Sequence, residues 1–160
     1  MKRIELSQGH FAIVDDEDYE HLIQHNWYSR KTKNTIYAVA NMNKTTVQMH
    51  RFIMKPERNF MVDHKNRNGL DNRRENLRIC TRSKNLMNSK KPGGKLTSKY
   101  KGVCYQKQSP GHLKCWKAEI RLNGKSIFLG YFYSEIEAAK AYNIAAVKYF
   151  GDFSNINEIV

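Results

Sequence analysis

Apolar and polar residues alternate strictly near the end of the chain, between residues 116 and 122. The even-numbered positions there are Trp, Ala, Ile and Leu, whereas the odd-numbered positions are Lys117, Glu119 and Arg121. A period of two is typical of a β-strand with one buried and one exposed face. The pair Asn123-Gly124, which follows directly, favours a two-residue hairpin turn. The pattern therefore predicts one arm of a β-hairpin.

Two further strands and one helix are predicted in the same C-terminal segment. Residues 100–106 and 126–132 are rich in aromatic and aliphatic side chains and indicate strands. Ser134 and Glu137 have the spacing of a capping box, and the helix that they begin is expected to end before Gly151. The many alanines of this helix would let it lie close to one face of the sheet. We therefore expect a three-stranded antiparallel sheet plus one helix.

The middle of the chain, residues 61–91, predicts a strand, a loop, a second strand and a short helix. Two apolar residues and an Asp-His pair open it, and a run rich in Asn and Gly follows. These residues tolerate the left-handed backbone that a chain reversal needs. Residues 76–80 form the second extended piece, and Thr81 or Ser83 could cap the helix.

Residues 1–43 predict a small α+β segment. A short amphipathic helix is expected after the first strand, with Asp15 and Asp16 as candidate capping residues. In this region and just beyond it we expect strands at residues 11–14, 36–40 and 45–49 and a helical turn at residues 49–54.

The charge of the chain is strongly positive. The 160 residues include 28 Lys and Arg against 15 Asp and Glu, a formal net charge of +13. This excess indicates a polyanionic partner, with nucleic acid and an anionic membrane surface as candidates. No apolar run approaches a bilayer span, and no apolar signal core follows the N-terminus, so we expect a cytoplasmic protein without a membrane partner. The three cysteines lack the spacing of a zinc knuckle or a disulfide framework.

Asp63, His64 and Asn85 offer chemistry that suits phosphodiester hydrolysis. A hard cation such as Mg²⁺ prefers oxygen ligands and usually takes only one or two from the protein, and Asp63 and the Asn85 amide oxygen could supply two. His64 points to the other side of an extended strand and has the pKa range of a general base at neutral pH. Six basic residues that surround this site suit a phosphodiester substrate: Arg67, Arg73, Arg74, Arg78, Arg82 and Lys84.

The stretch VDHKNRNGLDNRRENLR, followed by TRSKN, resembles the HNH nuclease superfamily in its ββα-metal form, and within it the phage and intron homing endonucleases. The resemblance implies Asp63 as a metal ligand, His64 as the general base, and Asn85 as the second metal ligand, where many relatives carry His. It also implies that Asn76 holds the loop so that the histidine is aimed correctly. The implied cofactor is a divalent metal, Mg²⁺ first and Mn²⁺ as the alternative.

Simpler interpretations apply to the same residues. Asp63 could do no more than hydrogen-bond local backbone N–H groups in a turn. The spacing of an EF-hand calcium loop is matched at four positions, but His64 would take the place of the first ligand, which argues against calcium binding. His50 is expected to be a packed, hydrogen-bonded histidine at the edge of the nuclease core, with a second catalytic or phosphate-contacting role as the alternative.

The C-terminal segment is similar to an AP2 DNA-binding domain through YKGV, WKAEIRLNGK, FLGYF, EAAKAYNIAAVKYFG and the closing FSNIN. The resemblance implies that Lys101, Glu119 and Arg121 lie on the DNA-reading face, with Trp116 in the core beneath. Arginine and glutamate are residues that read bases in the major groove. The chain departs from plant members where these usually carry Arg, Arg and Trp, at Cys104, Gln106 and Phe128. We therefore expect DNA binding but not the plant target sequence.

Together these observations predict an α+β fold with a ββα-metal HNH nuclease core between a small α+β segment and an AP2 domain. The expected parts are the lead-in 1–43, the nuclease core 44–90, a basic flexible linker 91–97 and the AP2 domain 98–157. The residues expected to contact DNA are Lys101, Lys117, Glu119, Arg121, Arg78, Arg82, Lys84 and Arg51.

The predicted function is a metal-dependent endonuclease that nicks one strand of double-stranded DNA, encoded by a phage or prophage in a bacterial host. A transcriptional regulator with an inert nuclease core and a structural RNA-binding protein are the alternatives. The sequence indicates no protein partner and leaves monomer and dimer open.

Overall fold

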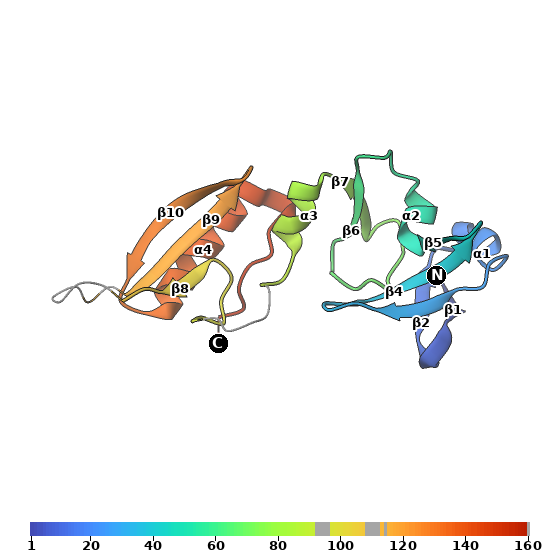
Figure 1. The fold of residues 1–160 in the computed structure, drawn as a ribbon, viewed down its shortest axis with the longest axis horizontal. Coiled ribbons are helices and arrows are strands. Elements are labelled where there is room, and N and C mark those ends of the chain that lie inside the picture. The colour runs from blue at the N-terminus through green and yellow to red at the C-terminus, as the bar shows by residue number, and fades with distance from the viewer. Residues whose placement is uncertain (92–96, 108–112, 114, 160) are drawn as a thin grey trace. The chain divides into compact units, whose positions relative to one another are not determined.

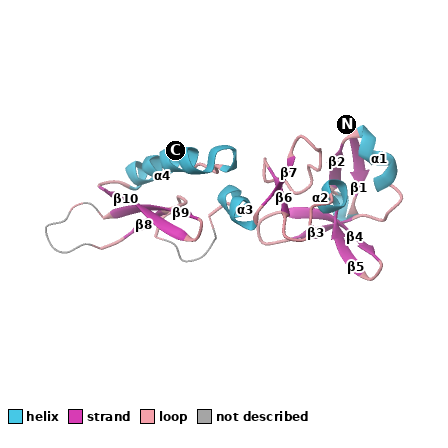
Figure 2. Ribbon diagram, turned by 90° about the horizontal axis from the view of Figure 1, so that it is seen from above, coloured by secondary structure: helices cyan, strands magenta, loops and turns pink. Residues whose placement is uncertain are grey.

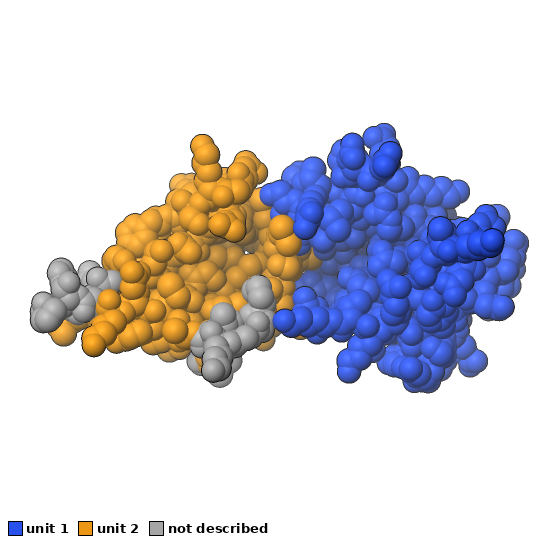
Figure 3. All heavy atoms as spheres, in the orientation of Figure 1, with its two compact units in different colours: residues 1–85 blue, residues 86–160 orange. Residues whose placement is uncertain are grey.

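The computed structural model describes residues 1–91, 97–107, 113 and 115–159 (Figure 1). The chain divides into two compact units, residues 1–85 and residues 86–160 (Figure 3). The division falls inside the short helix α3 (Arg82–Asn88). Most of the predicted linker, residues 92–96, lies outside the described residues.

The first unit consists of three small antiparallel sheets and short helices. Its sheets pair β1 with β2, β6 with β7, and β4 with both β3 and β5. The elements that precede α3 are β1 (Lys2–Glu5), η1 (Ser7–Gly9), β2 (Phe11–Val14), α1 (Asp16–Leu22), β3 (Tyr28–Lys31), β4 (Ile36–Met42), β5 (Thr45–Gln48), α2 (Met49–Met54), β6 (Met61–His64) and β7 (Leu77–Cys80). The predicted strand, loop, strand and helix of residues 61–91 are confirmed. Strands β1 and β3 were not predicted, because each contains one apolar or aromatic residue among polar ones and so shows no alternation.

One hydrophobic core holds the first unit together. Its buried members include Val14 and Leu22 from the N-terminal segment and Met49 and Val62 from farther along the chain. The boundary expected between residues 43 and 44 lies in the turn of the β4–β5 hairpin, where both residues have positive φ. Residues on the two sides of that boundary therefore fold together.

The loop between β6 and β7 is fixed against the N-terminal segment. The backbone of Ile13 in β2 accepts a hydrogen bond from Asn72 and donates one to Leu70, each 2.8 Å long. Gly69 lies so close to β4 that an added Cβ would meet the Ile36 carbonyl oxygen and would lie 2.6 Å from Cδ1 of Tyr37. Only a residue without a side chain permits this approach. The loop thus takes its shape from contacts distant in sequence.

The second unit contains a three-stranded antiparallel sheet and one long helix, as the alternation and the capping box predict. The sheet order is β10-β9-β8, and α4 covers one face (Figure 2). Fully buried alanines of α4, among them Ala138 and Ala146, bring the helix close to the sheet. The Ser134 hydroxyl accepts a hydrogen bond from the Glu137 backbone N–H, which confirms the cap. The elements that follow α3 are β8 (Val103–Tyr105), β9 (Trp116–Leu122), β10 (Lys125–Phe132), α4 (Glu135–Phe150) and η2 (Gly151–Phe153).

The strand predicted over residues 126–132 is confirmed as part of β10, and its register with β9 shifts between Phe128 and Gly130, which indicates a bulge. The predicted cap of α1 needs correction. Asp15 precedes α1 but makes no side-chain capping bond to it. Its carboxylate instead accepts a hydrogen bond of 2.7 Å from the backbone N–H of Arg74. The aspartate therefore stabilises the β6–β7 loop rather than the start of its own helix.

Candidate active site

Strand β6 places Asp63 and His64 next to each other at its C-terminal end. Because side chains alternate along a strand, Asp63 shares a face with Met61 while His64 points to the other face. The Nδ2 atom of Asn85 lies 3.8 Å from the Met61 sulfur. Asn85 therefore approaches the face of the β6–β7 ribbon from which Asp63 projects, as the proposed pair of metal ligands requires.

Asp63 is bound by an arginine that we had expected to contact DNA. Arg78, its cross-strand partner on β7, donates from Nε and Nη2 to Oδ2 of Asp63 at 2.8 and 2.6 Å. The two side chains are only 13% and 7% exposed. Burial and the charge of Asp63 also raise the pKa of Cys80. Arg78 is thus an internal counter-ion of the proposed metal ligand, not an outward-pointing cation.

His64 lies on the opposite face in an aromatic and polar environment. Its ring lies 4.8 Å from the ring of His50 and 5.9 Å from that of Tyr37, and its Nε2 atom lies 3.4 Å from Oδ1 of Asn72. Burial lowers the pKa of His64, while the contact with Asn72 and the charge of Asp63 partly oppose that shift. The imidazole is therefore neutral at physiological pH, the protonation state that a general base needs.

His50, on α2, is packed as expected but is not fully hydrogen-bonded. It is buried against Tyr37 and His64, and its Nδ1 atom has no hydrogen-bond partner among the described residues. Burial is the main cause that lowers the pKa of His50 to about 3, and the nearby His64 and Arg51 add to the shift. A histidine so strongly held neutral does not carry charge to a phosphate. The phosphate-contacting alternative is therefore not supported.

Asn76 connects the two ends of the β6–β7 loop. Its side chain accepts a hydrogen bond from the backbone N–H of Asn66 at 3.0 Å and donates to the Asn66 side chain and to the Asp71 carbonyl at 3.1 and 2.7 Å. Its side chain is buried. The residue is placed where it can hold the loop that follows His64.

Two more arginines of this loop are engaged with acidic side chains. Arg73 makes two hydrogen bonds of 2.8 Å to the buried Asp71, and this pairing lowers the pKa of the carboxyl group. Arg74 binds Asp18 and Glu17 on α1. Part of the charge of both arginines is therefore offset within the protein. Arg74 is nevertheless exposed, as are Arg67, Arg82 and Lys84.

Three charged side chains of β9 share the face of the C-terminal sheet that α4 does not cover. They are Lys117, Glu119 and Arg121, and the first two form an ion pair of 2.8 Å. Lys101 is placed elsewhere, because its ammonium donates to the carbonyls of Met87 and Ser89 at 2.6 Å. Arg51 of the first unit similarly donates to the Phe60 carbonyl.

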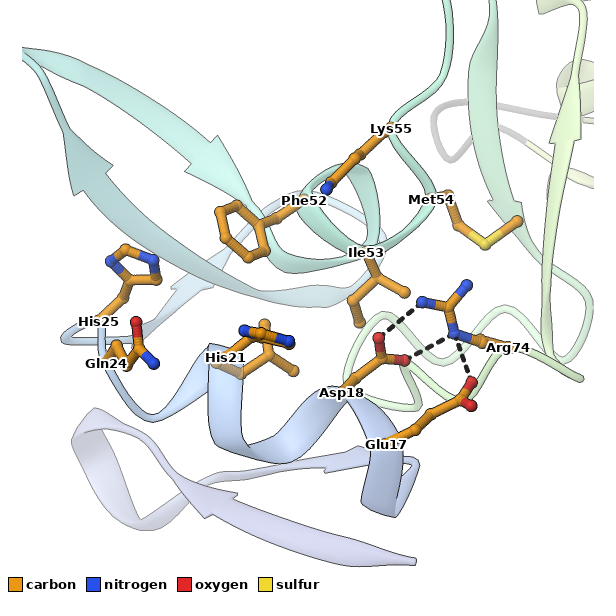
Figure 4. Close-up of a pocket in the computed structure, with 11 residues that line it drawn as sticks. Glu17, Asp18, His21, Gln24, His25, Phe52, Ile53, Met54, Lys55 and Arg74 are labelled. Carbon is orange, nitrogen blue, oxygen red and sulfur yellow. Dashed lines mark hydrogen bonds and ion pairs between the residues drawn. The ribbon is translucent and has the colours of Figure 1, made fainter.

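A hollow of about 720 Å³ in the first unit lies apart from these residues (Figure 4). It is lined by side chains of α1 and α2 and by Arg74, whose guanidinium bridges Asp18 and Glu17. The same acidic side chains, with Asp15, form the one group of three or more His, Cys, Asp or Glu that converges within 4.8 Å in the described chain. The guanidinium of Arg74 binds two of these three carboxylates and offsets part of their charge. Of the basic residues predicted around the site, Arg74 lines this hollow, but the predicted metal ligands and general base do not, and a polymer such as DNA needs an open surface rather than a pocket.

The donor set at Asp63 and Asn85 fits a hard divalent cation. One carboxylate and one amide oxygen match the preference of Mg²⁺, which usually completes its coordination with water and phosphate. Arg78 would have to share Asp63 with the ion, which a carboxylate with about four lone-pair positions allows.

Sequence reasoning missed two neighbours of His64. The sequence around Tyr37 predicts an ordinary strand residue, and no signal in the sequence connects it with His64. Asn72 lies in a run of Asn, Asp and Arg that reads as a solvated turn, yet it is fully buried. A buried amide is exceptional enough to mark a position with a structural or functional role.

Comparison with known proteins identifies the same segment. The HNH endonuclease family matches residues 55–87, which include β6, the loop, β7 and most of α3. An uncharacterized HNH endonuclease, L560 of Acanthamoeba polyphaga mimivirus, is 30% identical over 159 residues, which cover 95% of this chain and 77% of that protein. No solved structure matches the chain. None of the helices in the described part of the chain has the length and apolar composition to span a bilayer. The chain belongs to the HNH endonuclease family and is a nuclease, of a kind that generally uses a divalent metal ion.

Proposed function

We propose that this protein is a metal-dependent DNA endonuclease of the homing type that nicks one strand of a duplex. The observation that carries the proposal is the arrangement at β6, where Asn85 contacts Met61 on the face from which Asp63 projects, while His64 points to the other face. In the ββα-metal arrangement, such residues supply a cation site and a base on either side of one strand. One metal centre acts on one strand at a time, so a double-strand break would need a second event or a dimer.

Each residue has a distinct part in the proposed reaction. Asp63 and the Asn85 amide oxygen would hold the ion, Mg²⁺ in the first place and Mn²⁺ as the alternative. When bound, the ion would stabilise the negative charge that builds on the phosphate and on the leaving oxygen. His64 accepts a proton from the attacking water, whose oxygen bonds to phosphorus as the bond to the leaving oxygen breaks. Asn76 keeps the loop after His64 in place.

DNA binding is assigned to the second unit. Its three-stranded sheet and helix are what the resemblance to an AP2 domain implies, and the open sheet face presents Lys117, Glu119 and Arg121. A sheet can enter the major groove, where arginine reads guanine and glutamate accepts from cytosine. The exposed Arg82 and Lys84 of α3 suit contacts to the phosphate backbone. Lys101, Arg51 and Arg78 are left out of this assignment, because their charged groups bind within the protein.

A plasmid-nicking assay tests the proposal. The wild-type protein is compared with His64→Ala, each with Mg²⁺ and with EDTA, and duplex binding is measured in parallel. We expect conversion of supercoiled to open-circular DNA that needs the metal and falls by at least about 100-fold in the variant, the usual contribution of a general base. His21→Ala, which alters an exposed histidine of the same unit, is the matched control. Undiminished nicking by His64→Ala would remove His64 from the mechanism.

A sequence-specific DNA-binding regulator with an inert nuclease core is the second candidate. The Arg78–Asp63 pair favours it, because the guanidinium already satisfies the carboxylate that a metal would need. This candidate predicts duplex binding that survives EDTA, without nicking at any concentration of Mg²⁺ or Mn²⁺. The assay above separates the two.

A further inference from the structure

We propose that Asn72 is the positioning residue that sets the tautomer of His64, so that Nδ1 is the basic nitrogen of the imidazole. The inference rests on the proposed function in one respect, namely that His64 is the general base. It concerns a residue with no direct role in metal or DNA binding. The argument starts from the burial of Asn72 and from the atom that it directs at the histidine.

Asn72 is held rigidly and is 0% exposed. Its backbone N–H donates to the carbonyl of Ile13 in β2, and the neighbouring Asp71 forms a parallel bridge with the same residue. Ile13 lies outside residues 55–87, the segment that the HNH family matches. The N-terminal segment therefore helps to fix the position of a side chain beside the proposed base.

The amide oxygen decides which ring nitrogen carries the proton. Oδ1 of Asn72 lies 3.4 Å from Nε2 of His64, a long hydrogen bond of the kind that tightens when substrate binds. An amide oxygen can only accept, so Nε2 must carry the hydrogen, and the neutral imidazole then has its lone pair on Nδ1. In the reaction the water proton goes to Nδ1 while the O–H electron pair stays on the attacking oxygen. The imidazolium that results keeps its Nε2–H directed at Asn72.

The ring cannot easily turn to exchange its two nitrogens. The His50 ring meets it edge-on at 4.8 Å, and the Tyr37 ring lies 5.9 Å away on another side. Tyr37 is itself confined, because its ring atoms lie against Gly69 of the same loop. The tautomer is thus set by Asn72 and the orientation by the two rings.

If the Asn72 amide had the opposite orientation, the hydrogen of the His64 ring would be expected on the other nitrogen. With the amide turned over, Nδ2 would donate to Nε2, the ring hydrogen would lie on Nδ1, and no lone pair would remain for water. In the structure Nδ2 of Asn72 is buried without a hydrogen-bond partner among the described residues. The tautomer of His64 distinguishes the two orientations.

The tautomer is measured directly by ¹⁵N NMR of the imidazole groups in the full-length wild-type protein. The measurement is made at mildly alkaline pH, where an ordinary imidazole is neutral, and the missing signals of His64→Ala identify His64. We expect the hydrogen on Nε2. A hydrogen on Nδ1, or a rapidly exchanging mixture, would overturn the proposal. This result does not depend on nuclease activity, so it stays separate from the nicking test of His64 itself.

Two variants of Asn72 then test whether the contact matters for the reaction. Asn72→Asp keeps an acceptor beside Nε2, whereas Asn72→Leu keeps the shape without it. We expect kcat of the leucine variant to fall roughly 100-fold with KM little changed, and the aspartate variant to stay within about tenfold of the wild type. Leu22→Ala, which leaves a cavity in the hydrophobic core of the same unit, controls for destabilisation. A leucine variant that keeps both the tautomer and kcat would refute the inference, and if neither variant folds, the wild-type tautomer still decides.

Discussion

Replacing Arg78 with glutamine would remove the charge that neutralises Asp63 and keep a side chain of similar reach. In the wild type, two guanidinium N–H groups bind one oxygen of a buried carboxylate. A metal ion at Asp63 must share that carboxylate with the guanidinium. We therefore expect Arg78→Gln to destabilise the metal-free protein and, at the same time, to tighten metal binding.

The size of both effects follows from the burial of the pair. The side chains are 13% and 7% exposed, so little solvent screening reduces their interaction. Removing one partner of a buried pair costs about 3–5 kcal/mol, and the lower end applies because glutamine can still donate one hydrogen bond. A hydrogen bond to a charged group contributes about 1.5–3 kcal/mol. An ion relieved of one such competitor gains on the order of 2 kcal/mol, or roughly 30-fold in Kd.

Calorimetric titration with Mn²⁺, together with thermal unfolding with and without the ion, measures both quantities. Arg73→Gln is the matched control, since Arg73 also makes two hydrogen bonds to a buried aspartate of the same unit, Asp71. The control should lose stability without a gain in Mn²⁺ affinity. Equal or weaker Mn²⁺ binding by a folded Arg78→Gln protein would refute the reasoning. Arg78 would then orient Asp63 for the metal rather than compete with it.

Three further predictions concern the loop, pH and DNA. Gly69→Ala should lower the free energy of unfolding by about 2 kcal/mol and reduce nicking, because the new Cβ would meet the Ile36 carbonyl and the Tyr37 ring. A urea titration measures the change, and an unchanged midpoint would contradict this close packing. Burial lowers the pKa of His50 from 6.5 to about 3, so below pH 6.5 the unfolded state takes up a proton that the folded state excludes. The free energy of unfolding should therefore fall by about 1.4 kcal/mol per pH unit, and less steeply in His50→Leu; equal slopes would contradict the buried neutral state. Arg121→Ala should reduce the slope of log K against log salt by about 1 if the side chain contacts a phosphate, and should relax base preference with the slope unchanged if it reads a base.

The C-terminal sheet and helix were predictable because their signals are local. The alternation around Glu119 sets the two faces of a strand, and the Ser134 cap sets the start of a helix, whatever the rest of the chain does. The bulge near Gly130 was not predictable in the same way. It depends on how β10 meets β9 across the hairpin, which the alternation of either strand alone does not encode.

The arginines of the nuclease loop show where local reasoning fails. In the sequence Arg74 is one cation among several, because its partner Asp18 lies 56 residues earlier in the chain and nothing local connects the two. Arg78 and Asp63 are 15 residues apart and meet only because β6 and β7 pair in this register. A count of charges cannot distinguish a cation that meets solvent from one that binds a buried acid. The net charge therefore indicates the kind of partner, but it does not show which basic residues are available to bind it.

The same dependence on distant contacts applies to the catalytic loop as a whole. A two-stranded ribbon such as β6–β7 is marginally stable by itself, and a segment as short as residues 55–87 has little apolar surface to bury. The buried Val62 and Leu77 of this ribbon belong to a core shared with Val14 and Leu22 of the N-terminal segment. That segment also supplies Ile13, whose backbone binds the loop on both sides of Asp71. Residues 1–43 are therefore better understood as the support that gives the HNH motif its geometry than as a lead-in to it.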